Sequence, residues 1–185
     1  AGLPVEAGGL TVNRLCGSGL AAIIDAARAI RCDEGELFVA GGAESMSRAP
    51  FVMAKSESPF SRDFRAFDST IGARFPNPRI ESAFGADTMP ETADNIAREL
   101  NLSRDAVDAF AAQSQARYDA ALKDGFYEDE ILAIDVPQGR KKPPLSVSAD
   151  EHPRPQSTVE ALAGLRPLFE GGVVTAGNAS GINDG

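Results

Sequence analysis

A chain of 185 residues with 43% hydrophobic and 24% charged side chains has the composition of a globular domain, which excludes a disordered segment. Its net charge of −9 argues against general nucleic-acid binding, because that activity needs a basic surface to displace counterions from phosphates. Two cysteines and one histidine favour neither a disulfide framework nor a metal site, and no apolar run approaches the ~20 residues that cross a bilayer. We therefore expect a cytoplasmic protein without a metal, a nucleic-acid partner or a membrane partner.

The two ends of the chain carry no terminal signature. The first ten residues, AGLPVEAGGL, have no initiator methionine and no basic segment of the kind that opens a secretory signal. The last residues, GINDG, are not a polar tail. We expect a piece of a longer protein.

The opening section has the alternation of an α/β unit. Residues 10–14 predict a short extended segment. Residues 17–30 are apolar nearly all round, which predicts a buried helix. Residues 36–40 predict a short strand closed by two glycines. Strand, helix and strand in this order are typical of an α/β fold.

Residues 47–86 break this pattern. Four prolines interrupt them, and their apolar residues follow no steady period. A long irregular stretch inside a compact protein is typically a lid, a binding loop or disordered. We therefore predict an irregular excursion here.

Helices return after this excursion. Pro90 suits the first turn of a helix that runs to about residue 100. Ser103 is a good N-cap for a longer helix, and Gly125 is placed to end it. The helical period predicts an apolar face made of Val107, Phe110, Ala111, Tyr118, Ala121 and Leu122.

The last third predicts two strands and one helix. Residues 130–136 predict a strand, and the basic stretch 137–144 a turn. Residues 158–165 predict a short helix, and residues 173–178 a final strand.

Cys16 lies where the predicted helix begins, and two interpretations of it are open. A free thiol is only a few per cent ionised at neutral pH, but helix-terminal N–H groups and the helix dipole stabilise a thiolate. Gly17 and Gly19 leave room for an acyl group, and N–H groups there could stabilise an oxyanion. Such a thiolate is suited to hold an acyl group as a thioester. The alternative is a small buried hydrophobe, since cysteine is among the most buried residue types.

Longer segments resemble the thiolase family. TVNRLCGSGLAAI is similar to the thiolase segment that carries the nucleophile, and FVAGGAESMS to the strand and turn that follow it. Further similar segments come in the family's order: SRDAVDAFAAQSQ, GFYEDEI, LRPLF and VVTAGNASGINDG. RFPNPR (74–79) and TMPETADN (88–95) most resemble the degradative branch that acts on 3-oxoadipyl-CoA. Thr88 stands where acetoacetyl-CoA-forming relatives typically have a histidine.

The resemblance implies the layered αβαβα fold of thiolases, an α/β class, and a homodimer or homotetramer. Residues 1–47 and 172–185 would form part of the N-terminal core. Residues 48–171 would form the loop domain that covers coenzyme A, in agreement with the irregular stretch predicted above.

The resemblance also implies the reaction. A thiolase is an acyltransferase that cleaves a 3-oxoacyl-CoA, here 3-oxoadipyl-CoA, to acetyl-CoA and a shortened acyl-CoA through a thioester on Cys16. Acyl-CoA and coenzyme A are then substrates, and no permanently bound cofactor is expected. The family's activating histidine (in GHP) and second cysteine (in CxG) have no match, so we expect this chain alone to be inactive. His152 matches a loop-domain segment and is not assigned as the base.

The matching segments also imply contacts with coenzyme A. Arg154 matches an arginine near the adenine nucleotide, and Ser180 matches a serine that contacts the pantetheine. Ala176 and Ile182 would line the same groove. Met89 would lie near the pantetheine end.

Basic residues elsewhere have two interpretations. The cluster at 140–142 could meet the phosphates of coenzyme A, or it could be a solvated turn between strands. The arginines of the irregular stretch could pair with a substrate carboxylate, or they could lie on the surface of a loop: Arg65, Arg74 and Arg79.

Other functions remain open. The family also contains acetoacetyl-CoA thiolases and broad-range fatty-acid thiolases. A thiolase-like binding domain without chemistry, such as a lipid carrier or an inert fragment, would have no reason to keep Cys16 at a helix entry. A ketoacyl synthase loads acyl groups from a carrier protein, but VNRLCGSG and NASGINDG are more similar to thiolases.

Overall fold

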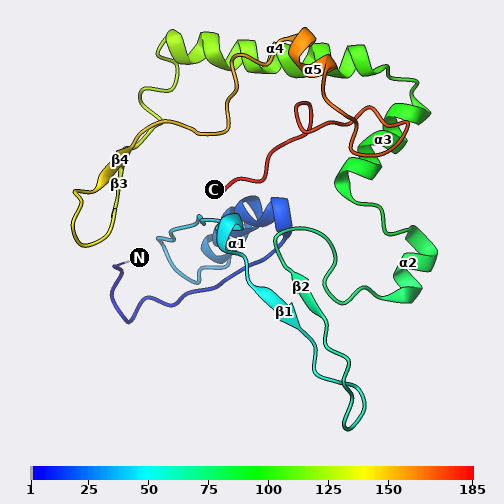
Figure 1. The fold of residues 1–185 in the computed structure, drawn as a ribbon. Helices are drawn as coiled ribbons and strands as arrows, with labels where there is room; N and C mark the ends of the chain where they lie inside the picture. Colours follow the sequence, from blue (N-terminus) through cyan, green and yellow to red (C-terminus); the bar gives the residue numbers. More distant parts are fainter. Residues whose placement is uncertain (1) are drawn as a thin grey trace. The chain divides into compact units, whose positions relative to one another are not determined.

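The structure is a computed structural model that describes residues 2–185, and these residues form two compact units. The first unit runs to Arg48 and also takes in Asp184–Gly185. The second unit is Ala49–Asn183. Figure 1 labels the helices and strands of both.

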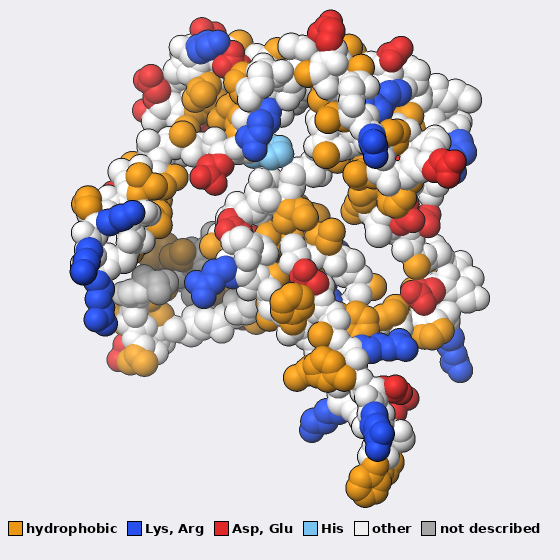
Figure 2. Space-filling model, viewed as in Figure 1, with side chains coloured by type: hydrophobic (Ala, Val, Ile, Leu, Met, Phe, Trp, Pro, Cys, Tyr) orange, Lys and Arg blue, Asp and Glu red, His pale blue; other side chains and the backbone are white. Residues whose placement is uncertain are grey.

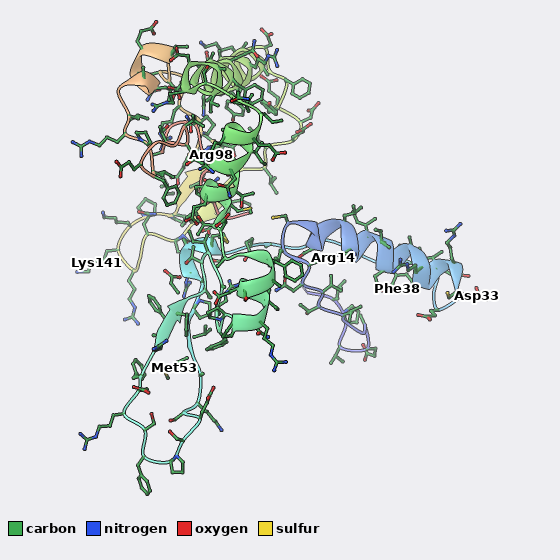
Figure 3. The ribbon with its side chains drawn as sticks, turned by 90° about the vertical axis from the view of Figure 1, so that its right-hand side faces the viewer. Arg14, Asp33, Phe38, Met53, Arg98 and Lys141 are labelled. Carbon is green, nitrogen blue, oxygen red and sulfur yellow. The ribbon has the colours of Figure 1, made fainter. Side chains whose placement is uncertain are left out.

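The first unit is built around one helix. The 3-10 turn η1 (Leu15–Gly17) leads directly into α1 (Ser18–Arg31), and a second 3-10 turn, η2 (Met46–Arg48), closes the unit. Arg14 lies at the start of α1 and Asp33 just beyond its end (Figure 3). The helix predicted over 17–30 is therefore confirmed.

The predicted burial of this helix is wrong for the described chain. No residue of α1 is buried, and Leu20 and Ile23 are 65% and 56% exposed. The reason is that, among the described residues of its unit, η1 is the only other element that packs closely against it. The segments 10–14 and 36–40 are not strands either, since neither has a neighbouring strand to complete a ladder among the described residues.

Two ends of the first unit are joined by hydrogen bonds. The Asp184 carboxylate accepts from the Ser47 N–H at 2.8 Å and from the Ser47 hydroxyl at 2.6 Å. The next residue, Gly185, donates its N–H to the Glu44 carbonyl at 3.0 Å. The bonds from Ser47 hold the pKa of the Asp184 carboxyl below its usual range. Residues far apart in sequence are thus paired at η2.

The second unit contains two antiparallel hairpins. In the first, β1 (Phe51–Met53) pairs with β2 (Ala66–Asp68). In the second, β3 (Ile134–Val136) pairs with β4 (Leu145–Val147). The predicted strand within 130–136 and the basic turn after it are therefore confirmed, and Figure 2 shows basic side chains gathered over that turn.

Four helices complete the second unit: α2 (Pro78–Phe84), α3 (Met89–Glu99), α4 (Arg104–Lys123) and α5 (Val159–Ala163). The stretch 47–86, predicted to be irregular, is more ordered than expected, because it holds the first hairpin and α2. The predicted helices after residue 88 and at 158–165 are confirmed.

The helix ends follow capping chemistry. Thr88 and Glu91 form a capping box at the start of α3, with Pro90 in the first turn. The Ser103 hydroxyl accepts from the Ala106 N–H at 3.2 Å at the start of α4. After α4, Gly125 takes a positive φ of 75°, which suits a residue without a side chain.

The predicted apolar face of α4 is only partly buried. Phe110 and Leu122 are 72% and 45% exposed, whereas Asp108 is 1% exposed. The polar partners of Asp108 come from segments distant in sequence, which the helical period does not reveal.

Few apolar side chains are buried in either unit. Among the described residues the buried hydrophobic ones are Ala97, Leu162 and Val174, all in the second unit. The accessible surface is 15961 Å², whereas two separate compact bodies of this mass would expose about 10,000 Å² in total. Figure 2 shows hydrophobic side chains spread over the visible face. Much apolar surface therefore lacks a cover within the described chain.

No helix in the described part of the chain is long and apolar enough to cross a membrane.

Candidate functional site

The chain around Cys16 is closed by short-range hydrogen bonds. The Asn13 side chain accepts from the Leu15 N–H at 3.0 Å. The Ser18 hydroxyl accepts from the Arg14 N–H at 2.8 Å and donates to the Leu15 carbonyl at 2.7 Å. These bonds fold the chain into a sharp turn that places Cys16 two residues before Ser18, the first residue of α1.

This turn holds a strained backbone. Leu15, directly before Cys16, has a φ of 51°, in the left-handed region that costs a residue with a side chain roughly 1–2 kcal/mol. Backbone strain of this kind clusters at functional sites, where the surrounding contacts maintain it. Here the Asn13 and Ser18 side chains are those contacts.

The thiol of Cys16 is exposed. The interpretation as a packing cysteine therefore finds no buried setting among the described residues. Gly19 has open space around its Cα, while the Gly17 N–H donates to the Arg14 carbonyl at 3.0 Å. Gly17 is thus engaged in the turn, whereas a side chain at Gly19 would meet open space.

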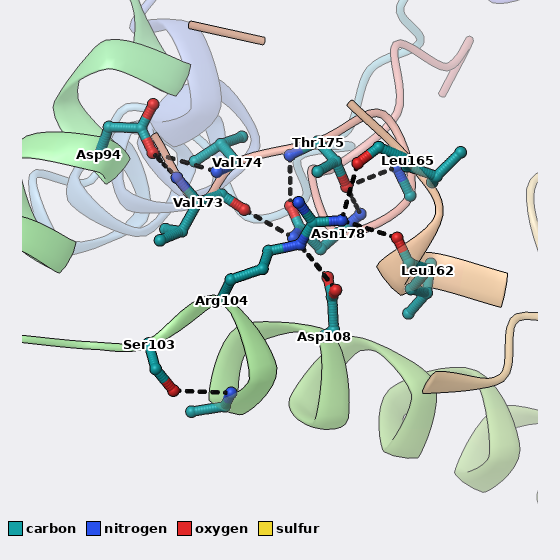
Figure 4. A network of polar contacts seen from close by, with 12 residues as sticks. Asp94, Ser103, Arg104, Asp108, Leu162, Leu165, Val173, Val174, Thr175 and Asn178 are labelled. Atoms are coloured by element: carbon teal, nitrogen blue, oxygen red, sulfur yellow. Dashed lines mark hydrogen bonds and ion pairs between the residues drawn. The ribbon is translucent and has the colours of Figure 1, made fainter. Parts of the chain in front are cut away.

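A buried polar network organises the second unit (Figure 4). The Asp108 carboxylate accepts from Arg104 Nε at 2.7 Å and from Asn178 Nδ2 at 2.8 Å. Arg104 also donates to the carbonyls of Leu162 and Leu165, at 2.7 and 3.0 Å. One ion pair on α4 therefore joins α5 to the segment that carries Asn178.

Asn178 is held by every polar group of its side chain. Its Nδ2 also donates to the Val173 carbonyl at 2.9 Å, and its Oδ1 accepts from the Thr175 N–H at 2.7 Å. Thr175 is fully buried, and its hydroxyl accepts from the Gly177 N–H at 3.2 Å. These bonds form a tight turn over residues 175–178.

A second carboxylate holds the start of this segment. Asp94 on α3 is 5% exposed and accepts from the N–H groups of Val173 and Val174 at 2.7 and 3.0 Å. Only Gly fits at position 172, because a Cβ there would collide with the Asp94 carboxylate. The strand predicted over 173–178 is wrong for this reason: a side chain takes the N–H groups that a neighbouring strand would bind, and only Thr175 forms a bridge, to Pro167.

The loop 150–154 is fixed to the middle of α4. Gln115 Oε1 accepts from the Arg154 N–H at 2.7 Å, and the Tyr118 hydroxyl donates to Asp150 Oδ2 at 3.0 Å. Desolvation, and then the hydrogen bond to the Asp150 carboxylate, raise the pKa of Tyr118. The same loop reaches residue 181, where a Cβ on Gly181 would lie 2.5 Å from the His152 ring.

The residues matched to coenzyme A contacts lie in the second unit. His152 joins the loop of Arg154 to the segment of Ser180 and Ile182, so these three are brought into one neighbourhood. Ala176 is exposed on the tight turn just before them. Met89, the first residue of α3, is 76% exposed. Cys16 lies in the first unit.

The basic residues with two interpretations are placed as follows. The cluster at 140–142 lies in the exposed turn between β3 and β4, as a solvated turn would. Arg74 donates to the Ser69 carbonyl beside the first hairpin. Arg65 and Arg79 are exposed. The second cysteine, Cys32, is exposed and caps the end of α1.

Sequence reasoning missed the residues that hold the second unit together: Asp94, Asp108, Gln115 and Asn178. One signal was available, since Asp108 follows Arg104 by four residues, the spacing of an ion pair on one helix face. Asp94, Gln115 and Asn178 each have a partner 39 to 80 residues away, and no local pattern reveals these pairings.

The fold and the Cys16 turn define an α/β chain that presents an exposed cysteine at a helix entry. The chain belongs to the thiolase family: the family model described as "Thiolase, N-terminal domain" matches residues 1–185. The family resemblance inferred from the segments around Cys16 is thereby confirmed.

Several relatives are similar along the whole chain. Beta-ketoadipyl-CoA thiolase of Acinetobacter baylyi is 52% identical over 100% of this chain, which covers 46% of that protein. The 3-oxoadipyl-CoA/3-oxo-5,6-dehydrosuberyl-CoA thiolase of Escherichia coli gives the same values. An acetyl-CoA acetyltransferase of Pseudomonas aeruginosa is 46% identical with the same coverage. The chain thus spans about half the length of the curated relatives it matches.

A solved structure supports the fold. The human mitochondrial 3-ketoacyl-CoA thiolase in complex with CoA matches 99% of this chain with a TM-score of 0.80 and 37% sequence identity. The chain covers 44% of that structure. The predicted thiolase-like α/β fold is therefore confirmed. The division into 1–47 with 172–185 and 48–171 stays a prediction; in this structure residues 172–183 pack with the second unit.

Proposed function

We propose that this chain is the acyl-carrying part of a thiolase, an acetyl-CoA C-acyltransferase that cleaves a 3-oxoacyl-CoA. The observation that carries the proposal is the exposed Cys16 on a strained turn at the entry of α1. A thiol placed there is accessible to a substrate, and the N-terminal end of a helix favours the thiolate.

The proposed reaction has two steps. Cys16 Sγ attacks the C3 carbonyl carbon of the substrate, and the C2–C3 bond breaks. Its electron pair leaves as the enolate of acetyl-CoA, which the thioester carbonyl stabilises and which takes a proton at C2. The shortened acyl group stays on Cys16 as a thioester. A coenzyme A thiolate then attacks the acyl carbon, the bond from that carbon to Cys16 Sγ breaks, and the shortened acyl-CoA leaves while the Cys16 thiolate takes up a proton.

Coenzyme A is proposed to meet the second unit at Arg154, Ser180, Ala176, Ile182 and Met89. Two observations favour this. The solved human relative is in complex with CoA. The loop of Arg154 also lies against residue 181, so the residues proposed for the nucleotide and the pantetheine are neighbours. The proposal includes no permanently bound cofactor, and coenzyme A and acyl-CoA act as substrates.

The proposed substrate is 3-oxoadipyl-CoA. Seven relatives 50% to 53% identical to this chain carry beta-ketoadipyl-CoA or 3-oxoadipyl-CoA thiolase names. A relative 46% identical is an acetyl-CoA acetyltransferase, which keeps acetoacetyl-CoA as the second candidate substrate. Competing thiolysis of the two substrates by a protein of the relatives' full length decides between them.

A homodimer or homotetramer in the cytoplasm completes the proposal. The exposed apolar surface of both units favours burial against other protein, as in an assembly of several copies, because soluble monomers rarely leave large apolar patches open.

Acyl transfer to Cys16 is testable by mass spectrometry. We expect a protein of the relatives' full length that carries this chain to gain an acetyl adduct from acetyl-CoA, and Cys16→Ser to abolish it. Cys32→Ser is the matched control, since Cys32 is equally exposed, and it should keep the adduct. An adduct that persists in Cys16→Ser would refute the proposed role. The 185-residue chain alone is expected to show no thiolysis.

A further inference from the structure

We infer that Gln115 is a positioning residue for coenzyme A, acting through the loop that carries Arg154. This inference rests on the proposed function, since it assigns Arg154 to the nucleotide end of the ligand. Gln115 itself is not expected to touch the ligand. Its role is to hold the backbone from which the Arg154 side chain projects.

The bond that carries this inference is short and unshared. Gln115 Oε1 accepts from the Arg154 N–H at 2.7 Å, across 39 residues of sequence. One helical turn further along α4, the Tyr118 hydroxyl binds Asp150 Oδ2 at 3.0 Å. Residues three apart lie on the same face of a helix, so α4 holds this loop at both ends.

The loop in turn fixes the Arg154 guanidinium. Nη1 donates to the carbonyls of Glu151, His152 and Pro153, at 2.6, 3.1 and 3.1 Å. All of these bonds use the same nitrogen. Among the described residues, no acceptor meets the Nε and Nη2 donors of Arg154, so these donors are open to an anionic ligand, and a guanidinium is well suited to phosphate oxygens. If the loop moved, these donors would move with it.

The loop also sets the spacing to the pantetheine residues. The His152 ring lies against Gly181, where a Cβ would be 2.5 Å from its Cε1 and Nδ1 atoms. Gly181 stands between Ser180 and Ile182. The loop that Gln115 holds is thus in contact with the segment proposed for the other end of the ligand.

The test compares two acyl acceptors, coenzyme A and pantetheine, which lacks the nucleotide. The protein is one of the relatives' full length that carries this chain. Gln115→Leu removes the acceptor of the Arg154 N–H. We expect the KM for coenzyme A to rise about 10-fold, with kcat within about twofold of the unchanged protein. The kcat/KM for pantetheine should stay unchanged, because pantetheine does not use Arg154.

Two variants control this test. Gln113→Leu makes the same substitution on an exposed position of α4 and should leave both acceptors unaffected. Gln115→Glu keeps an oxygen at the same position and should restore the KM for coenzyme A. If Gln115→Leu does not fold, Gln115→Asn, which withdraws the oxygen by one methylene, is measured in the same way.

The outcomes separate this inference from the proposed function. Equal losses with coenzyme A and pantetheine, a loss in kcat alone, or no change in Gln115→Leu would each overturn the positioning role. Failure of the unchanged protein to acylate Cys16 would instead overturn the proposed function.

Discussion

The two units place their long helices in opposite surroundings. α1 is apolar nearly all round, yet none of its residues is buried in the described chain. α4 is more polar, yet it holds Asp108 at 1% exposure and bonds to segments more than 30 residues away. Local sequence patterns thus predicted that both were helices but gave the wrong picture of what each contacts. A helix is buried by its neighbours, and only α4 has them here.

The same contrast appears in the backbone. The glycines at 8, 9, 41 and 42 of the first unit have open space around them. In the second unit, Gly172, Gly177 and Gly181 each lie so close to a side chain that a Cβ would collide with it. The second unit is therefore closely packed at residues 172–181, although few of its apolar side chains are buried.

The largest effect is expected from removing the acceptor at the centre of the buried polar network, Asp108. Asp108→Ala leaves the Arg104 guanidinium and the Asn178 amide without their shared acceptor, so we expect a loss of about 3–5 kcal/mol in the free energy of unfolding. Urea denaturation followed by helical circular dichroism measures it. Asp105→Ala, an exposed acid in the first turn of the same helix, should cost at most about 1 kcal/mol. Similar losses for both would mean that the network is not what stabilises α4.

A smaller effect tests the close approach of the backbone to α3. Gly172→Ala would push a methyl group into the Asp94 carboxylate, and we expect a loss of about 1–3 kcal/mol in the free energy of unfolding. Gly41→Ala meets open space and should change it little. The two variants are compared by thermal denaturation. A tolerated Gly172→Ala would remove the packing contrast between the two units.

The smallest effect concerns pH at the start of α3. Hydrogen bonds from the Thr88 N–H and hydroxyl, both 2.7 Å, lower the pKa of the Glu91 carboxyl. A lowered pKa in the folded state means that Glu91 contributes stability above the usual glutamate value of about 4.3, and that this contribution is lost as pH falls through the folded pKa. Stability should therefore decline in acid less steeply in Glu91→Gln than in the unchanged chain. Circular dichroism melts between pH 6 and pH 3 (roughly the range in which carboxyls titrate) measure the difference, and parallel slopes would contradict it.

The local part of the fold was predictable from the sequence. Pro90 and Ser103 located the starts of α3 and α4, because each acts on the residues next to it, and the apolar run of residues 17–30 located α1. Cys16 was recognised as a candidate nucleophile for the same reason, since a helix entry is a local feature. The segments around it also identified the family that the comparisons confirm.

Tertiary structure decided the rest. Whether residues 173–178 pair as a strand depends on Asp94, which takes the N–H groups of Val173 and Val174 from 79 and 80 residues away. Gln115 and Arg154 are 39 residues apart in the sequence, so no periodicity or spacing predicts their hydrogen bond. The sequence by itself determined where helices begin and which thiol stands at a helix entry, because those follow from neighbouring residues. What each helix is buried against, and which side chains hold the loops, depends on contacts that only folding brings together.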